Sequence, residues 1–110
     1  MRIAIVGSRD MIVESIKNYV TENDEIVSGG AVGVDHCAAE YARKNGLKLT
    51  EFLPDYARYG RAAPIIRNRQ IVDYADRVVV FWNGSSKGTL SVIKYAEKVG
   101  KPCEVILCEQ

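Results

Sequence analysis

Hydrophobic residues occur along this chain in two alternating patterns. Short apolar runs predict strands, and they cover residues 3–6, 25–28, 47–53, 77–82 and 103–108. Between them, apolar residues recur every three or four positions, which predicts amphipathic helices over 11–22, 34–45, 64–74 and 89–99. The run 47–53 alternates with polar residues more than the others do, so we expect it near an edge of the sheet. Residues 54–63 are expected to form an irregular loop.

The regular alternation of strands and helices predicts the fold class. Strands separated by helices form parallel sheets that carry helices on both faces. Because crossovers between parallel strands are right-handed, the expected fold is a three-layer α/β/α doubly wound sheet of about five parallel strands. No linker, repeat or low-complexity segment divides the chain, so residues 1–110 are expected to form a single domain.

The composition is that of an ordinary globular protein, and it narrows the choice of partners. Hydrophobic residues make up 47% and charged residues 26% of the 110 residues, which argues against disorder. The formal net charge of +1 provides no overall basic field for nucleic acid, so phosphate recognition has to be local. No apolar run approaches the roughly 20 residues that cross a bilayer, so no membrane partner is expected.

The three cysteines indicate a reducing compartment. Cys103 and Cys108 lie five positions apart in a predicted strand, so they face opposite sides and cannot easily pair. With Cys37 they make an odd number without regular spacing, which predicts free thiols and a cytoplasmic protein. Gly7 interrupts the first apolar run too early for a secretory signal peptide.

Three loops after predicted strands are rich in glycine and small polar residues, and each of them opens a helix. They are residues 7–9, 29–35 and 83–89. Loops after parallel strands share one edge of the sheet, where ligands bind. Glycine lets a phosphate approach the backbone, and free N–H groups at helix starts favour an anion. Turn and capping preferences explain any one such loop, but three at one edge favour an anion site. None matches G-x-G-x-x-G or a Walker A loop.

Four arginines lie within twelve residues in and after the expected loop, with no acidic residue between them: Arg58, Arg61, Arg67 and Arg69. Guanidinium groups match phosphate oxygens bidentately, so the cluster is a candidate phosphate clamp. The alternative is a solvated basic start of a helix. Arginines near a helix N-terminus oppose the helix dipole unless an anion is present, which favours the clamp.

Asp35 lies just inside a predicted helix start and has two interpretations. It either caps that helix and interacts with its dipole, or it accepts a ribose hydroxyl or organises the phosphate loop. Trp82, Tyr56 and Tyr59 are similarly either structural aromatics or rings that stack on a base at the rim of the site.

Metal and triad chemistry have little support. His36 is the single histidine and is expected to be structural or at the surface, and no zinc-ligand spacing exists. Ser8, Ser85 and Ser86 have no histidine partner for a catalytic triad. No metal and no obligatory cofactor are therefore expected, only a nucleotide-like ligand.

Four segments together resemble the SLOG superfamily, and more narrowly its small YspA/YpsA-related bacterial and phage branch. They are residues 5–9, 28–35, 67–71 and 84–89. The G-G-A-x-G-x-D block at 29–35 and the R-N-R block at 67–69 are the specific parts of the resemblance, which runs over essentially the whole chain. It implies a Rossmann-like sheet that binds nucleotides or nucleotide-derived ligands. Most SLOG relatives self-associate, so the resemblance also implies a homodimer.

Two groups of SLOG relatives suggest activities. The Lonely Guy phosphoribohydrolases carry P-G-G-x-G-T-x-x-E, with the glutamate stabilising charge at the sugar. The matching run here keeps Gly88 and Thr89 but has Val92 at the glutamate position, while Arg67 matches the partner arginine of that family. An apolar residue cannot stabilise an oxocarbenium-like centre. The DNA-processing protein A group, which has a similar glycine block, binds single-stranded DNA.

The leading hypothesis is a module that binds or senses a nucleotide or a nucleotide-derived small molecule. One alternative is a nucleoside-monophosphate N-glycosidase or phosphoribohydrolase that uses a different acid. Val92 at the glutamate position argues against an enzyme. The other is a single-stranded nucleic-acid binder, against which the near-neutral charge argues. The residues expected to approach the ligand are Gly7, Ser8, Arg9, Gly29, Gly30, Ala31, Gly33, Asp35, Arg67, Asn68, Gly84, Ser85, Gly88 and Thr89.

Overall fold

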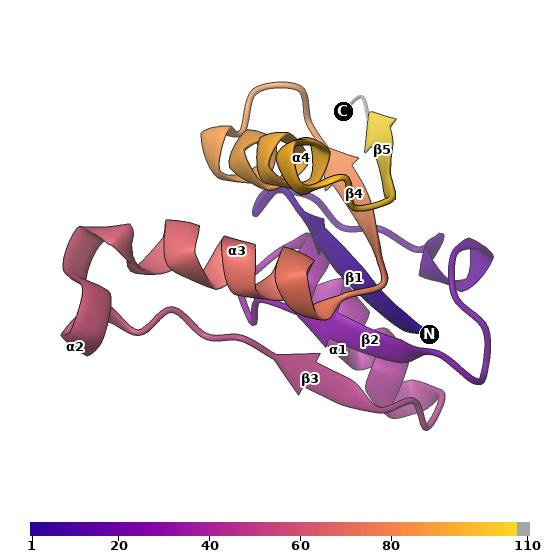
Figure 1. Ribbon diagram of the computed structural model, residues 1–110. Helices are drawn as coiled ribbons and strands as arrows, with labels where there is room; N and C mark the ends of the chain where they lie inside the picture. Colours follow the sequence, from indigo (N-terminus) through magenta and orange to yellow (C-terminus); the bar gives the residue numbers. More distant parts are fainter. Residues whose placement is uncertain (108–110) are drawn as a thin grey trace.

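The computed structural model describes residues 1–107, which form a five-stranded parallel sheet with the order β3-β2-β1-β4-β5 (Figure 1). The strands are β1 Arg2–Gly7, β2 Glu25–Ser28, β3 Leu49–Glu51, β4 Arg77–Trp82 and β5 Cys103–Leu107. The chain winds outward from β1 to β3 and then returns to β4 on the other side of β1. This is the doubly wound, Rossmann-like arrangement that the alternating pattern predicts.

Helices cover both faces of the sheet and make the three layers. Helix α1 (Val34–Lys44) packs on one face, and α3 (Ala63–Tyr74) and α4 (Lys87–Val99) pack on the other (Figure 1). The sheet supplies both cores because neighbouring strand residues point to opposite faces. On β1, Ile3 and Ile5 face α1, whereas Ala4 and Val6 face α3 and α4.

The predicted helix over 11–22 is wrong. In this segment the structure contains one short 3-10 turn, η1, at Ile16–Asn18. Met11, Ile16 and Val20 reach the core, but Ile12, which belongs to the predicted helical face, is 85% exposed. The segment is rich in β-branched residues with weak helix propensity, so an irregular path that buries selected side chains prevails over the periodic pattern.

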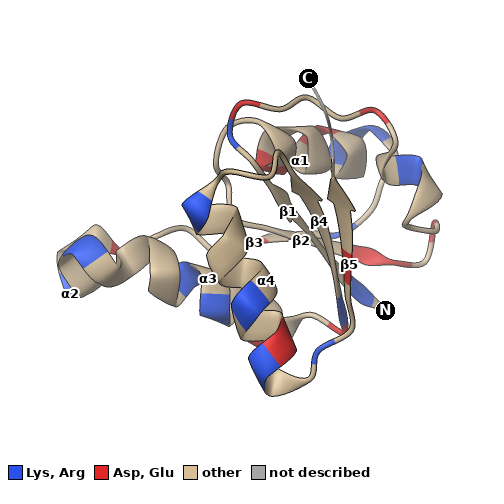
Figure 2. Cartoon of the chain, turned by 90° about the horizontal axis from the view of Figure 1, so that it is seen from above, with Lys and Arg blue, Asp and Glu red and all other residues tan. Residues whose placement is uncertain are grey.

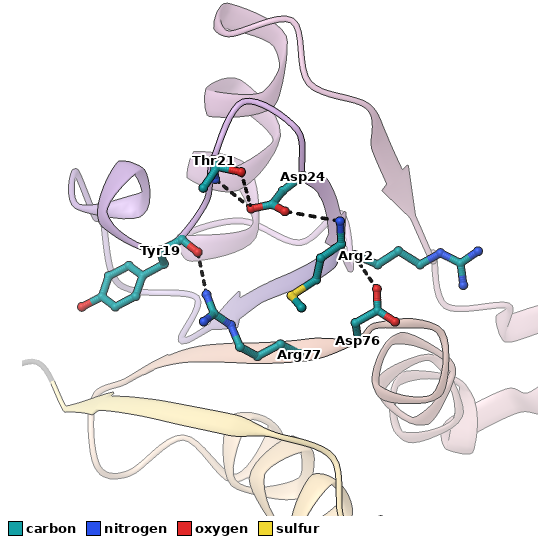
Figure 3. Close-up of polar contacts among 7 residues, drawn as sticks. Arg2, Tyr19, Thr21, Asp24, Asp76 and Arg77 are labelled. Carbon is teal, nitrogen blue, oxygen red and sulfur yellow. Dashed lines mark hydrogen bonds and ion pairs between the residues drawn. The ribbon is translucent and has the colours of Figure 1, made fainter.

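A tertiary contact also binds a backbone carbonyl group within the segment of that predicted helix. The Arg77 guanidinium donates a hydrogen bond of 2.6 Å from Nη2 to the carbonyl oxygen of Tyr19 (Figure 3). Nearby, the Asp24 carboxylate accepts the Thr21 N–H at 2.7 Å and lies 3.4 Å from the Met1 amino group. These contacts secure residues 19–24 at the amino-terminal edge of the sheet, opposite the ends where ligands bind in this fold.

The connection from β3 to α3 has more local structure than the predicted irregular loop. It contains a single helical turn, α2 (Tyr56–Tyr59), and a 3-10 turn, η2 (Gly60–Ala62). Asp55 caps α2 by accepting the Arg58 N–H at 3.1 Å. No residue of α2 is buried in the described structure, and α2 stands away from the sheet at the start of α3 (Figure 1). Strand β3 lies at the edge of the sheet, as its alternation predicts.

The structure also bears on the predictions about free thiols and membrane-spanning segments. Cys37 and Cys103 are free thiols, and Cys108 lies outside the described residues, so its predicted position relative to Cys103 is untested. None of the helices formed by residues 1–107 has the length and apolar character required to span a bilayer.

Candidate functional site

A cavity of about 450 Å³ lies at the carboxyl edge of the sheet, where the loops after β1, β2, β3 and β4 meet the starts of α3 and α4. The strand order reverses beside β1, and ligands of open α/β sheets bind at such a switch point. The volume is within the range of small-molecule sites. The lining residues are Val6, Gly7, Arg9, Gly29, Gly30, Ala31, Asp35, Pro54, Tyr56, Pro64, Arg67, Asn68, Ile71, Ser86, Gly88, Thr89 and Val92.

Most of the candidate ligand residues from the sequence line this cavity. They come from loops far apart in the chain: Gly7, Arg9, Gly29, Gly30, Ala31, Asp35, Arg67, Asn68, Gly88 and Thr89. Four candidates do not line it: Ser8, Gly33, Gly84 and Ser85. The sequence did not predict the apolar residues that line the cavity. An apolar side chain near a loop can line a cavity or pack in the core, and the sequence pattern is the same in both cases.

Ser8 and Gly33 shape the loops around the cavity. The Ser8 side chain is fully buried, and its Oγ accepts the Asn83 N–H at 3.1 Å. Gly33 has a φ of +76°, and a Cβ there would lie 2.5 Å from the carbonyl oxygen of Arg9. Both residues therefore hold the loop after β1 against its neighbours.

Asn83 organises the loop between β4 and α4. Gly84 and Ser85, which do not line the cavity, form part of the turn that Asn83 closes. Its Oδ1 accepts the N–H groups of Ser85 and Ser86 at 2.9 and 2.8 Å, closing a tight turn. Its Nδ2 donates to the Asp10 carboxylate at 3.1 Å, which joins this loop to the one after β1. Gly84 supplies the positive φ, +86°, that the turn requires.

The Arg67 guanidinium is fixed from two sides at the cavity wall. Nη1 donates to the carbonyl oxygen of Gly29 at 2.6 Å, and Nε donates to Asn68 Oδ1 at 2.9 Å. Asn68 in turn donates to Ser91 Oγ on α4 at 3.2 Å. An arginine has five N–H donors, and within residues 1–107 no acceptor bonds the two on Nη2. Arg67 is thus held rigidly while part of its donor set stays available.

Gly29 makes room for both charged groups of the site. A Cβ at this position would lie 2.8 Å from Arg67 Nη1 and 2.8 Å from Asp35 Oδ2. Any larger residue would push one of these side chains away. The glycine predicted to let a ligand approach the backbone therefore also lets an arginine and a carboxylate approach it.

The Asp35 carboxyl joins the loops after β1 and β2. It is only 6% exposed, and Oδ2 accepts the Ala31 N–H at 3.3 Å. Burial raises the pKa of this carboxyl, against hydrogen bonds from the backbone of Ala31, Gly29 and Gly7 and the charge of Arg67. Asp35 does not cap α1, whose N-cap is Gly33 without a side-chain cap. Among the sequence alternatives, this geometry favours an organiser of the glycine loops.

A model of one protein family matches residues 1–59 of this chain, the YspA, cpYpsA-related SLOG family (YAcAr). The chain belongs to this family. The match covers Gly7 and the block 29–35, and it ends before Arg67 and the loop 83–89. A search of the curated proteins found no match. Membership in the SLOG family supports a nucleotide-related binding or processing role in general terms.

The four-arginine clamp predicted for this SLOG domain is not assembled. Arg67 alone of the cluster lines the cavity, and Arg9 from the loop after β1 supplies a second cation. The Arg58 and Arg69 guanidinium groups instead lie over tyrosine rings, at 5.2 and 5.5 Å from the ring centroids. Figure 2 shows how lysines and arginines spread along α2, α3 and α4. Successive residues of a helix point in different directions, which separates the cluster.

The candidate aromatics of the SLOG domain also separate. Trp82 Nε1 donates to the carbonyl oxygen of Ser86 at 3.1 Å, and the ring packs against the core, so it is structural. Tyr59 does not line the cavity, whereas Tyr56 does. His36 is at the surface, with Nε2 3.3 Å from Glu40 Oε1. No cluster of His, Cys, Asp or Glu suited to a metal occurs within residues 1–107.

Val92, at the position of the Lonely Guy glutamate, lies in the cavity wall and is 3% exposed. At this position the chain has an apolar group in contact with the cavity, where the Lonely Guy enzymes have an acid. Among the described lining residues, Asp35 is the one carboxylic acid, and its carboxyl accepts hydrogen bonds from backbone N–H groups.

Proposed function

We propose that this SLOG domain binds a nucleotide or a nucleotide-derived small molecule in the cavity at the carboxyl edge of its sheet. The observation that carries the proposal is the fixed Arg67 guanidinium, which has unbonded Nη2 donors beside three glycine-bearing loops. A preorganised guanidinium binds phosphate strongly because its geometry matches the oxygens and little side-chain entropy is lost.

Gly88 supports a phosphate position at the start of α4. A Cβ at Gly88 would meet nothing within 4 Å among the described residues, and its φ is not in the left-handed region. The fold therefore does not require glycine here, although glycine weakens a helix relative to alanine. The first N–H groups of a helix have no acceptor within it, and among residues 1–107 no acceptor bonds those of Lys87 and Gly88, which can therefore bond an anion. We interpret Gly88 as space for a phosphate.

Binding without chemistry is the better supported role. Val92 removes the acid with which the Lonely Guy enzymes stabilise charge at the sugar. Asp35 cannot replace it in the same way, because the backbone donors of two loops already hold its carboxyl. We expect no base to be released when the domain is incubated with nucleoside monophosphates.

Thermal unfolding in the presence of nucleoside mono- and diphosphates and ADP-ribose tests the proposal. A ligand at ten times its Kd should add about 1.4 kcal/mol to the free energy of unfolding, which raises Tm by several degrees. Arg67→Ala should abolish the shift. Arg69→Ala is the matched control, since Arg69 lies on the same helix but outside the cavity. No shift with any compound, or equal shifts in wild type and Arg67→Ala, would refute the proposal.

A further inference from the structure

Tyr56 is a large aromatic side chain that lines the cavity with most of its surface in solvent. It is 61% exposed, although it lines the same cavity as Pro54 and Pro64. In the part of the chain that the structure describes, its hydroxyl has no hydrogen-bond partner and its ring has no aromatic partner. Its contribution to the core is therefore small, and packing does not explain an aromatic residue here.

The backbone that carries Tyr56 is fixed. Asp55 caps α2 through its side chain, and its carbonyl oxygen accepts the Tyr59 N–H at 2.9 Å. Pro54 precedes this turn and restricts the chain further. The ring is thus presented at the cavity from a defined turn.

The cavity-lining residues of α3 place the ring relative to the phosphate donor. Pro64, Arg67, Asn68 and Ile71 all line the cavity, and their spacing puts them on one face of the helix. Pro64 precedes Arg67 by three residues, about 4.5 Å along the axis at about 1.5 Å per residue. From Arg67 towards α2, the wall therefore changes from guanidinium to proline and tyrosine. Charge and apolar surface are separated as they are in a nucleotide.

We propose that Tyr56 stacks on the base of the bound nucleotide and so selects ligands with an aromatic ring over bare sugar phosphates. This inference rests on the proposed function, because it assumes that the phosphate lies at Arg67. Flat apolar faces of tyrosine and base stack without a required hydrogen-bond pattern, so the ring recognises bases as a class. One exposed ring beside a cavity suits a single base better than a strand of nucleic acid, which needs several platforms.

Calorimetric titration with two kinds of probe tests the role of Tyr56. The probes are the four common nucleoside 5′-monophosphates and ribose 5-phosphate, which has the same sugar and phosphate but no base. In the wild type we expect the best mononucleotide to bind roughly 5- to 100-fold more tightly than ribose 5-phosphate. Tyr56→Ala should remove this difference and leave ribose 5-phosphate unaffected. Tyr56→Phe should keep it, and Tyr59→Ala, on the same turn but outside the cavity, should change neither affinity.

Each other result has a distinct meaning. Equal weakening of both probes by Tyr56→Ala would place Tyr56 on the sugar phosphate and overturn the stacking role. Unchanged affinities would overturn it as well, and a simultaneous change of mass in sedimentation would show that the ring contacts another chain. If the wild type binds none of these probes, the stacking role is overturned; the proposed function is refuted as well only if the thermal assay also shows no shift with nucleoside diphosphates and ADP-ribose. Circular dichroism of each variant verifies the fold, which an exposed side chain should not affect.

Discussion

Arg67 Nη1 donates a hydrogen bond of 2.6 Å to the carbonyl oxygen of Gly29, which lies 38 residues earlier in the chain. This contact joins α3 to the loop after β2 at the carboxyl edge of the sheet. It orients the one guanidinium of the arginine cluster that lines the cavity. The absence of a side chain at Gly29 allows this contact, because a Cβ there would lie 2.8 Å from Arg67 Nη1.

Gly29→Ala should weaken ligand binding much more than it weakens the fold. The new Cβ would lie 2.8 Å from both Arg67 Nη1 and Asp35 Oδ2, and we expect the half-buried arginine to move in preference to the buried carboxyl. Because the φ of Gly29 is not in the left-handed region and the arginine can move outward, the free energy of unfolding should change by no more than about 1 kcal/mol. Losing a charge-assisted contact should weaken binding about tenfold or more. Calorimetric titration and urea denaturation measure the two effects, and unchanged affinity would show that the Arg67 position is unimportant.

Gly88→Ala should stabilise the domain and weaken binding at the same time. Alanine is favoured over glycine in a helix, by up to about 1 kcal/mol, and nothing in the described structure obstructs the new methyl group. That methyl group would occupy the space that we assign to the phosphate. Urea denaturation of the free protein and titration with the best mononucleotide measure the two effects. An increase in stability with unchanged affinity would exclude a phosphate at the start of α4.

Asp35→Asn should change the dependence of stability on pH in a defined direction. Burial raises the pKa of Asp35 above its ordinary value of 3.8, despite the opposing backbone donors and Arg67. The folded state therefore holds this proton more tightly than the unfolded state does. The resulting stabilisation is complete below pH 3.8 and is lost as pH rises through the folded pKa.

The free energy of unfolding of wild type relative to Asp35→Asn should accordingly decrease as pH rises through this window. The decrease cannot exceed about 1.4 kcal/mol per pH unit for one proton. Urea denaturation at successive pH values gives the difference between the two free energies of unfolding. The slope of this difference against pH is the test, because the amide of the variant also changes the hydrogen bonds and so shifts the difference at every pH. A parallel pair of curves would show that the pKa of Asp35 is the same in both states.

Glu25→Gln should act in the opposite direction. The Glu25 side chain is 14% exposed, and its Oε2 accepts hydrogen bonds of 2.7 Å from Tyr74 and from Thr50. Burial opposes ionisation, but these bonds and Lys48 outweigh it and lower the pKa below its ordinary value of 4.5. The stabilisation is therefore present above pH 4.5 and is lost as pH falls through the folded pKa.

At pH 7 the Glu25→Gln variant should be less stable than the wild type by about 1.5–3 kcal/mol, the range for hydrogen bonds to a charged group. The difference should shrink on acidification below pH 4.5. The exposed Glu97→Gln change is the control for loss of one negative charge. A difference that stays constant between pH 7 and pH 3 would contradict the lowered pKa.

The hydrophobic pattern predicts strands and helices best where local and tertiary preferences agree. The apolar run of β4 and the capped, periodic segment of α4 are examples, and both form close to their predicted bounds. The segment 11–22 has the period of a helix but residues with weak helix propensity, and the contacts of Arg77 and of the core decide its path. Periodicity alone cannot detect such competition, because it does not include partners that are distant in the chain.

The amino-acid sequence alone is enough to predict the parallel sheet, the glycine-bearing loops at one edge and the conformations that glycine makes possible, since each depends on local periodicity or backbone sterics. Which charged groups meet at that edge depends on tertiary contacts. Arg67 enters the cavity while Arg69 lies over a tyrosine ring, and Asp35 binds loop N–H groups in place of capping α1. The physical reason is that helical phase and packing select a few side chains from a cluster, and the carbonyl that holds Arg67 belongs to Gly29 in the loop after β2.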